Sequence, residues 1–255
     1  MREYDPQLTI EGNGPALVLV PGMNGSGQLF YRQVPRLQAG YRVATYSLRD
    51  DAESLDVLAA DLRAIVDQVA SPQGRAIIVG ESFGGAVALT FALAHPGRVE
   101  ALVILNSFPY FAPQLRLRLA LAGLAVLPWG AMRIVRRLTA WRLHSGHTHR
   151  AEVKRFIELT ADATRGGYLN RLQLLRRYDV RSQLGRLEPP TLFLAAEQDH
   201  LVPSVDQARY MAERAPRSAF RILQGHGHIC LIAPDLDLSE IIDRWRAGPA
   251  VSDAT

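Results

Sequence analysis

The chain is predicted to fold as one α/β domain with a mostly parallel sheet of about seven strands, flanked by helices and interrupted by a helical insertion. Three observations predict this fold. Short apolar runs alternate with helical patterns, polar loops follow the carboxyl ends of those runs, and the alternation stops between residues 109 and 187. We therefore expect a core formed by residues 1–108 and 188–255, with an all-helical lid over residues 109–187.

The composition fits a globular domain of the size of an enzyme. The 255 residues are 48% hydrophobic and 21% charged and contain no repeat, so one large core can be buried. The lone Cys230 excludes an internal disulfide and favours a reducing compartment. The first residues lack the apolar stretch of a signal peptide. We expect a cytoplasmic protein without a transmembrane segment, and nothing in the sequence indicates its oligomeric state.

The sheet is expected to begin with two strands near the N-terminus. Residues 7–11 predict a short first strand, and Ala16–Val20 is a fully apolar run typical of a buried one. A glycine-rich loop follows at residues 21–27. It could cradle a phosphate, but it lacks both the Gly-x-Gly-x-x-Gly fingerprint and the Lys-Ser/Thr ending of a P-loop. Its flexibility instead suits a loop that directs the backbone N–H of Met23 toward a reacting oxygen.

A serine stands where the next buried strand is expected to end. The run Ala76–Val79 leads into Gly-Glu-Ser-Phe-Gly at residues 80–84, and small and apolar residues at helical spacing follow. The two glycines let the strand and the helix approach closely, which leaves the Ser82 hydroxyl exposed at a strained turn. We predict that Ser82 is a nucleophile and that the N–H groups of Met23 and Phe83 form an oxyanion hole.

A nucleophilic serine requires a carboxylate to orient its histidine partner, and Asp199 is the candidate. Asp199 lies in the loop after Thr191–Ala196, an apolar run that predicts a buried strand. Open α/β sheets bind ligands at the carboxyl ends of their strands, so this aspartate can meet a serine from another strand. Alternatively, Asp199 only shapes the turn before Pro203.

The candidate proton acceptor is His228. It follows the alternating run Ala219–Leu223, and Gly227 gives the chain the freedom to turn the imidazole back over the sheet edge. His226 is expected to pack or hydrogen-bond locally, and residues 229–232 to begin the closing helix. The resulting order of serine, aspartate and histidine is one in which such triads occur along a chain.

The insertion is predicted to be helical throughout. Helical patterns fall near residues 114–126, 129–143, 149–163 and 168–178, with starts at Pro113 and Pro128 and breaks at Gly146 and Gly166–Gly167. The apolar stretch Leu115–Leu127 is too short to span a bilayer. We expect it to pack on the core or to line a hydrophobic acyl pocket.

Basic residues concentrate in this insertion. Residues 112–186 hold 15 Lys and Arg against 4 Asp and Glu, a net charge of +11, while the whole chain carries +4, so the remainder carries −7. This charge could attract an anionic substrate or an anionic membrane surface, or it could simply be solvated on the outer faces of helices. No nucleic-acid recognition motif accompanies it, so we expect no nucleic-acid partner.

A metal site is not expected. Residues 144–149 contain three histidines, but no carboxylate or cysteine ligand stands nearby, and we interpret the segment as a surface loop. Cys230 is interpreted as a small core residue rather than a catalytic thiol. Neither a metal nor a cofactor is therefore predicted.

The motifs at residues 20–23, 80–85, 197–203 and 225–228 together resemble those of the α/β-hydrolase superfamily. The resemblance covers nearly the whole chain outside residues 109–187. It implies an α/β-hydrolase core with an inserted cap. It also implies matching roles for individual residues: Ser82 as nucleophile, Asp199 as acid, His228 as base, and the Met23 and Phe83 N–H groups as oxyanion-hole donors.

Two positions bear on this resemblance. Pro21 stands where many members have a histidine, which leaves the oxyanion loop intact but removes a side chain that often braces it. Asn106 occupies the position where certain relatives carry the acid, and its lack of charge strengthens the assignment of Asp199.

We expect a lidded serine hydrolase that cleaves a small-molecule carboxylic ester or thioester through an acyl-enzyme intermediate, without a cofactor. A medium-to-long hydrophobic acyl pocket is a further expectation, and whether the basic insertion binds an anionic substrate or is only solvated stays open. Acyl transfer to another acceptor, and C–C bond or lactone hydrolysis, are alternatives on the same triad. A hydrolase-like protein that binds a ligand without turnover is the alternative from a different class.

Overall fold

The computed structural model describes residues 4–70, 74–111, 123, 129–131, 134, 143–146, 148–161 and 163–248. One sheet has the strand order β1-β3-β2-β4-β5-β6-β7. Only β1 runs antiparallel to its neighbour β3, so the prediction of a mostly parallel seven-stranded sheet is confirmed. The strands are β1 (Thr9–Glu11), β2 (Ala16–Val20), β3 (Arg42–Thr45), β4 (Ala76–Glu81), β5 (Val99–Leu105), β6 (Thr191–Ala196) and β7 (Ser218–Leu223).

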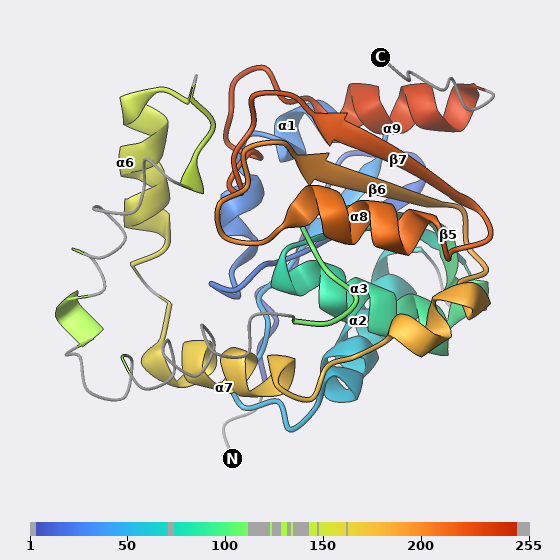
Figure 1. Ribbon diagram of the computed structural model, residues 1–255, viewed down its shortest axis with the longest axis horizontal. Coiled ribbons are helices and arrows are strands. Elements are labelled where there is room, and N and C mark those ends of the chain that lie inside the picture. Colours follow the sequence, from blue (N-terminus) through green and yellow to red (C-terminus); the bar gives the residue numbers. More distant parts are fainter. Residues whose placement is uncertain are drawn as a thin grey trace.

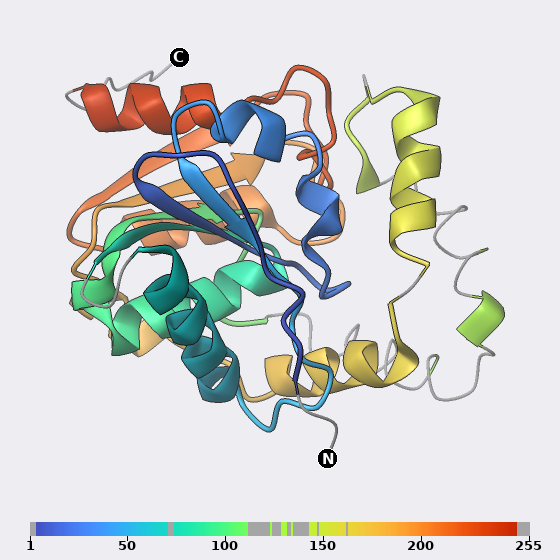
Figure 2. The same ribbon diagram turned by 180° about the vertical axis from the view of Figure 1, so that it is seen from behind.

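Helices cover both faces of this sheet (Figures 1 and 2). On one face lie α2 (Leu55–Val69), α3 (Phe83–Ala94) and α8 (Ser204–Ala212), and on the other lie α1 (Val34–Leu37) and α9 (Leu238–Ala247). The structure also contains short 3₁₀ helices: η1 (Gly27–Phe30), η2 (Pro96–Arg98), η3 (Trp129–Ala131) and η4 (Arg181–Arg186).

The apolar runs become strands that are buried on both faces. Along β2, Val18 and Val20 pack into the cluster under α2 and α3, while Leu17 and Leu19 pack into the cluster under α1 and α9. Continuous apolar sequence, rather than alternation, is what a parallel sheet covered on both faces requires.

The closing helix begins later than predicted. Residues 229–237 form no helix, and α9 starts at Leu238. Asp237 caps it by accepting hydrogen bonds from the N–H groups of Ser239 (2.9 Å) and Glu240 (3.2 Å). Pro234 cannot continue a helix begun at residue 229, and Asp237 is a strong N-cap, so the start moves downstream.

Two helices lie in the described part of the segment between β5 and β6: α6 (Arg150–Leu159) and α7 (Arg165–Leu175). Figure 1 shows α6 to one side of the sheet and α7 at the lower left, lower than α3. The predicted break at Gly166–Gly167 is wrong, because Thr164 caps α7 and its hydroxyl accepts from the Gly167 N–H at 2.9 Å. The predicted helix at 114–126, most of that at 129–143, and both prolines fall outside the described residues.

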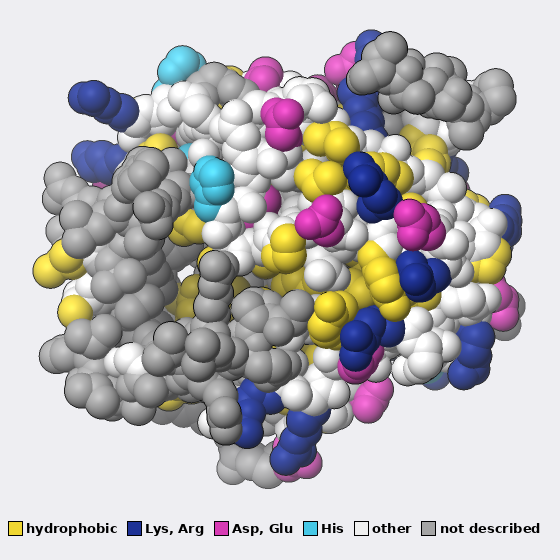
Figure 3. Space-filling model, in the orientation of Figure 1, with side chains coloured by type: hydrophobic (Ala, Val, Ile, Leu, Met, Phe, Trp, Pro, Cys, Tyr) yellow, Lys and Arg dark blue, Asp and Glu magenta, His cyan; other side chains and the backbone are white. Residues whose placement is uncertain are grey.

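Charges on the described surface are mixed. Basic and acidic side chains intersperse on the face drawn in Figure 3. None of the helices within the described ranges is long and apolar enough to cross a bilayer.

Candidate active site

Ser82 occupies a strained turn between β4 and α3. Its backbone has φ 53° and ψ −118°, a region that costs a non-glycine residue of the order of 1–3 kcal/mol. Close packing forces this turn on the chain. A Cβ on Gly80 would lie 2.5 Å from the Gly84 carbonyl oxygen, and one on Gly84 would lie 2.2 Å from the Val20 carbonyl oxygen. Glycine at both positions is therefore a steric requirement.

Hydrogen bonds from the neighbouring strand hold the same turn. The Ser82 N–H donates to the Leu105 carbonyl at 2.9 Å, and the Ser107 hydroxyl donates to the Ser82 carbonyl at 2.7 Å. Both partners lie at the carboxyl end of β5 or just beyond it. The turn is thus fixed by buried core groups alone, and the Ser82 Oγ is the part left to react.

The structure brings Ser82, His228 and Asp199 into one chain of contacts. His228 Nε2 lies 3.0 Å from Ser82 Oγ, and His228 Nδ1 lies 2.7 Å from Asp199 Oδ2. The His228 and Asp199 side chains are only 5% and 1% exposed, so little water screens this pair. The alternative that Asp199 merely shapes its turn is incomplete, because one carboxylate oxygen faces the imidazole.

The remaining Asp199 contacts fix that carboxylate. Oδ1 accepts from the N–H groups of Leu201 and Val202, both at 2.9 Å, and Oδ2 also accepts from the Ser204 hydroxyl. Burial raises the pKa of Asp199, but the His228 charge and these donated hydrogen bonds outweigh it and leave the pKa below its usual range. Asp199 is therefore ionised at neutral pH.

Opposing effects also set the pKa of His228. Burial lowers its pKa, but the Asp199 carboxylate, through its charge and its hydrogen bond, and the charge of Glu81 raise the pKa above that of an ordinary histidine. An imidazole held between a hydroxyl and a carboxylate can accept the hydroxyl proton while the carboxylate stabilises the resulting cation.

Asn106 braces the histidine loop from the core, a role that the sequence analysis missed. Its Nδ2 donates to the His228 carbonyl at 2.7 Å, and its Oδ1 accepts from the Ala196 N–H at 2.7 Å. It is fully buried and has φ 49°. The amide links the end of β6 to the loop that carries His228. An asparagine directly after a buried strand, where positive φ is tolerated, was the available signal.

Glu81 is a second carboxyl group close to the histidine. Its Oε1 lies 3.9 Å from His228 Nε2, and its side chain is 13% exposed. Burial raises the pKa of Glu81 to about 7, with the His228 charge lowering it and the Asp199 charge raising it. Its carboxyl group has no hydrogen bond to another of the described residues. No role for Glu81 was predicted from the sequence.

The oxyanion loop follows β2 and contains Met23. A turn in which the Gly25 N–H donates to the Gly22 carbonyl at 3.0 Å shapes it, with Gly25 at φ 78°. Within the described residues, neither the Met23 N–H nor the Phe83 N–H donates a hydrogen bond. Both predicted donors are thus available to another acceptor.

The segment Leu143–Ser145 contacts the histidine loop from outside the core. The Ile229 N–H donates to the Leu143 carbonyl at 2.7 Å, and the Gly227 N–H donates to the Ser145 hydroxyl at 3.3 Å. Ser145 Oγ also lies 2.9 Å from His226 Nδ1, so the hydrogen-bond partner of His226 comes from a distant segment.

The interpretation of residues 144–149 as a surface loop is wrong for His144. This side chain is buried, and its ring packs edge-on against Phe156 with centroids 5.0 Å apart. Burial lowers the pKa of His144 to about 4, so the ring is neutral. Pairing with the histidine loop draws this segment inward. Among the described residues, no group of three or more His, Cys, Asp or Glu side chains could hold a metal ion.

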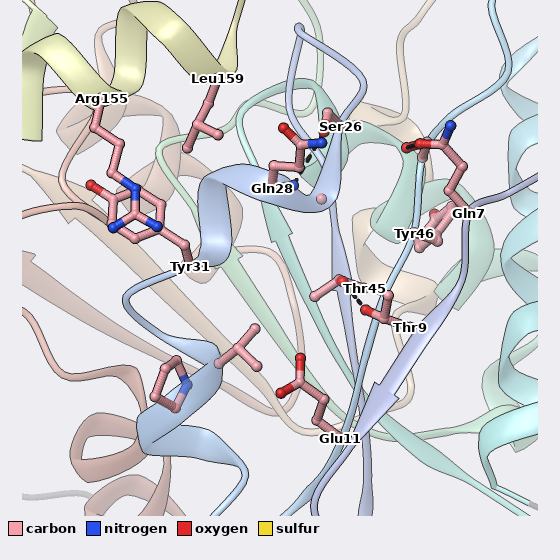
Figure 4. Close-up of a pocket in the computed structure, with 14 residues that line it drawn as sticks. Gln7, Thr9, Glu11, Ser26, Gln28, Tyr31, Thr45, Tyr46, Arg155 and Leu159 are labelled. Carbon is pink, nitrogen blue, oxygen red and sulfur yellow. Dashed lines mark hydrogen bonds between the residues drawn. The ribbon is translucent and has the colours of Figure 1, made fainter.

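A hollow of about 510 Å³ lies away from these residues, between the β1 and β3 strands, η1 and α6 (Figure 4). None of Ser82, His228 or Asp199 lines it. On its rim, the Arg155 guanidinium of α6 stacks 3.9 Å from the centre of the Tyr31 ring. Glu152 of α6 accepts from Arg32 Nη1 at 2.7 Å. The hollow thus marks where α6 is attached to the core.

The fold, the strand order and the serine at the tip of β4 are together typical of one class of proteins. The family model for the alpha/beta hydrolase fold matches residues 15–233, and the chain belongs to this family. The predicted family and fold are thereby confirmed, and the chain is a member of a family of hydrolases.

Similar proteins include two that carry the name carbamate hydrolase RutD. The one from Yersinia enterocolitica is 30% identical over 230 residues, which are 85% of this chain and 82% of the relative. The one from Escherichia coli O157:H7 is 27% identical over 233 residues, 86% of each chain. The solved structure of a thermophilic esterase from Thermogutta terrifontis superposes with a TM-score of 0.81 at 22% identity, covering 94% of this chain and 92% of the esterase.

Proposed function

We propose that the protein is a serine hydrolase that cleaves a carboxylic ester or thioester through an acyl-enzyme intermediate. The observation that carries the proposal is the contact chain from Ser82 Oγ to His228 Nε2 at 3.0 Å and from His228 Nδ1 to Asp199 Oδ2 at 2.7 Å. Hydroxyl, imidazole and carboxylate in this order are the groups that acyl transfer requires.

The steps follow from these groups. Ser82 Oγ attacks the substrate carbonyl carbon while His228 Nε2 accepts its proton, and the carbonyl oxygen becomes an oxyanion. The tetrahedral intermediate collapses as His228 donates that proton to the leaving alcohol or thiol. Water then attacks the acyl-enzyme, again with His228 as base, and the acid and free Ser82 are released. Asp199 stabilises the imidazolium at each stage.

The oxyanion is assigned to the N–H groups of Met23 and Phe83. Their availability supports this assignment, and so does their placement, because Phe83 follows the nucleophile and opens α3, whose N-terminus favours negative charge. Met23 comes from the loop at the end of β2, the strand adjacent to β4.

The segment 109–187 is proposed to act as a lid over this site. Its described helices contact core loops through Glu152 of α6 and Arg171 of α7, and its net charge of +11 favours an anionic substrate. Part of that charge is already paired, since Arg171 contacts Asp50 and Arg181 contacts Asp179. The hydrophobic acyl pocket predicted from residues 115–127 lies almost wholly outside the described residues.

Carbamate hydrolysis is a second candidate. It is favoured by the relatives named carbamate hydrolase, of which one is 30% identical to this chain. A carbamate presents the same carbonyl carbon to Ser82, so the same residues would act on it. The two candidates differ only in the group attached to the carbonyl.

Labelling with a fluorophosphonate, followed by peptide mass spectrometry, tests the nucleophile. The probe should modify Ser82 alone, and modification should disappear in Ser82→Ala and fall sharply in His228→Ala. The exposed His149 provides a matched control, and His149→Ala should label normally. Labelling at another residue, or a His228→Ala rate equal to that of the control, contradicts the proposal.

A substrate panel then separates the candidates. It compares p-nitrophenyl esters from C2 to C8, an acyl thioester and an aryl carbamate at matched concentrations. Turnover of esters or thioesters supports the first candidate, and turnover confined to the carbamate supports the second. Hydrolysis that is best with acetate and absent at C8 would contradict the hydrophobic acyl pocket.

A further inference from the structure

Arg171 of α7 is a buried arginine whose contacts all lie on core loops. Its side chain is only 2% exposed, although arginine is almost never fully buried unless it is paired. Nη2 donates to Asp50 Oδ1 at 2.7 Å and to the Leu48 carbonyl at 3.4 Å, and Nη1 donates to the Met23 carbonyl at 3.3 Å. One guanidinium therefore joins the loop after β3 to the oxyanion loop after β2.

The surrounding chain leaves space for this guanidinium. A Cβ on Gly25 would lie 2.2 Å from Arg171 Nη2, and a Cβ on Gly167 would lie 1.9 Å from Asp50 Oδ1. The oxyanion loop thus passes directly against the arginine. A larger residue at either glycine would displace the guanidinium or the loop.

Further contacts seat α7 on the same part of the core. The Thr164 hydroxyl donates to Asp50 Oδ2 at 2.5 Å, and Asn170 Nδ2 donates to the Ala52 carbonyl at 2.8 Å. Asp50 is therefore held through both oxygens by residues of α7 and its cap. This leaves Arg171 in a fixed position relative to the loop after β3.

The two peptide planes that flank Met23 are fixed by different partners. A trans peptide places its C=O and N–H on opposite sides, so the Gly25 bond to the Gly22 carbonyl also sets where the Met23 N–H points. The next plane carries the Met23 carbonyl, which Arg171 holds. The Leu48 N–H also holds the loop, by donating to the Gly25 carbonyl at 2.8 Å, but neither backbone bond reaches the Met23 carbonyl. Without Arg171 that carbonyl loses its partner, and rotation about the Met23 Cα can redirect the loop.

We propose that Arg171 is a positioning residue that holds the Met23 N–H in place for the oxyanion and so makes oxyanion stabilisation depend on the seating of α7. This inference rests on the proposed serine hydrolase function. Arg171 touches neither the substrate nor the reacting atoms in this account, and it acts through the loop. The guanidinium geometry matters because its planar donors reach a carboxylate and two carbonyls at once, which a lysine cannot do.

The test compares an ester with its thionoester, in which sulfur replaces the carbonyl oxygen. Sulfur is larger and accepts hydrogen bonds poorly, so the ester-to-thionoester rate ratio reports how well the oxyanion donors are placed. Arg171→Met should lower kcat for the ester by roughly 10–100-fold with little change in KM, since losing a whole oxyanion donor costs about 10²–10³-fold. The rate ratio should fall, with Arg171→Lys intermediate.

A purely structural role would not change that ratio, because loss of folded protein slows both substrates equally. Rates are therefore normalised to active sites titrated in each preparation. Arg181→Met is the matched control, since Arg181 is 43% exposed and pairs with Asp179 on the surface. It should keep the wild-type ratio.

If Arg171→Met does not fold, Asp50→Asn still tests the inference. Asp50 is 43% exposed and its asparagine variant has the same shape, so the fold should survive while Arg171 loses its charged partner. A smaller fall of the rate ratio in the same direction supports the inference. If the ester-to-thionoester rate ratio is unchanged in both Arg171→Lys and Asp50→Asn, the inference about Arg171 is overturned while the proposed function still stands. Absence of both ester turnover and Ser82 labelling in the unmodified chain overturns the proposed function, and the inference with it.

Discussion

The nucleophile turn and the two loops that face it are held in different ways. The core alone supplies the hydrogen bonds that fix the backbone of Ser82, from Leu105 and Ser107. The histidine loop is held by Asn106 of the core and also by Leu143–Ser145, and the oxyanion loop contacts Arg171. The nucleophile turn thus depends on the core alone, while residues of the insertion 109–187 also hold the histidine loop and the oxyanion loop.

This difference teaches where the adaptable part of the site lies. Changes in the insertion can alter the histidine loop and the oxyanion loop without disturbing the turn that carries the serine. Because loops on this type of fold vary while the sheet persists, specificity and reactivity can both be adjusted from one segment.

The largest expected effect is a loss of kcat, caused by a change in the core. Asp199→Asn keeps the size of the side chain but removes the charge that orients and stabilises the His228 imidazolium. We expect kcat to fall by about 10⁴-fold. Because burial and backbone donors remain, thermal unfolding should change little by comparison. The control is Asp206→Asn, on α8. Steady-state kinetics measure both variants, and a kcat of Asp199→Asn within tenfold of that of the control would refute the role of Asp199.

The second effect is on stability rather than on rate. A methyl group on Gly84 would lie 2.2 Å from the Val20 carbonyl oxygen and 2.6 Å from that of Pro21, both backbone atoms. Gly84→Ala should therefore push α3 away from β2 and lower the free energy of unfolding by about 3 kcal/mol. Urea denaturation measures this. Gly185→Ala, where a Cβ would meet nothing within 4 Å, is the matched control and should cost far less.

Sequence reasoning succeeded where the signal was local. The turn at Ser82 could be predicted because the glycines that it requires stand within two residues of it. Parallel strands buried on both faces require apolar runs, so Ala16–Val20 and Thr191–Ala196 were assignable as strands, although their order in the sheet was not. Asp199 could be proposed because it follows such a run, and His228 because it follows the alternating run Ala219–Leu223.

The remaining features depend on contacts between distant residues. Nothing near Arg171 in the sequence indicates that its guanidinium reaches Met23, 148 positions away. His144 looked like part of a surface loop because its bridge to Ile229 has no local signature. The start of α9 was misplaced for a different reason, because the apolar run after His228 packs as a coil in the core rather than as a helix.

The third prediction tests the insertion side at the histidine loop. Ser145→Ala removes the acceptor of the Gly227 N–H and the contact with His226 Nδ1. Loss of these buried bonds should lower the free energy of unfolding by about 1–2 kcal/mol. Because the His228 backbone still has Asn106, kcat should fall by less than tenfold. The exposed Ser182 offers a control in Ser182→Ala. A loss of kcat as large as that of Asp199→Asn would show that the insertion, rather than the core, positions His228.

The smallest effect concerns Glu81, which stands on the core side but outside the proposed triad. The reaction requires neutral His228 as base, so kcat/KM should fall as the pH drops through the His228 pKa. That pKa is raised in part by the Glu81 charge, 3.9 Å from Nε2. Glu81→Gln removes the charge, lowers the pKa of His228 and should move the acid limb of the pH profile to lower pH.

The direction of this shift separates two roles for Glu81. If it only fills space against Gly22, the isosteric glutamine leaves the acid limb where it was. If Glu81 itself had to be protonated for activity, the profile of the glutamate enzyme would fall as the pH rises through about 7, and glutamine would abolish that fall. A downward shift of the acid limb alone identifies the carboxylate as a charge that raises the pKa of His228. Glu188→Gln, at an exposed position, should leave the profile unchanged.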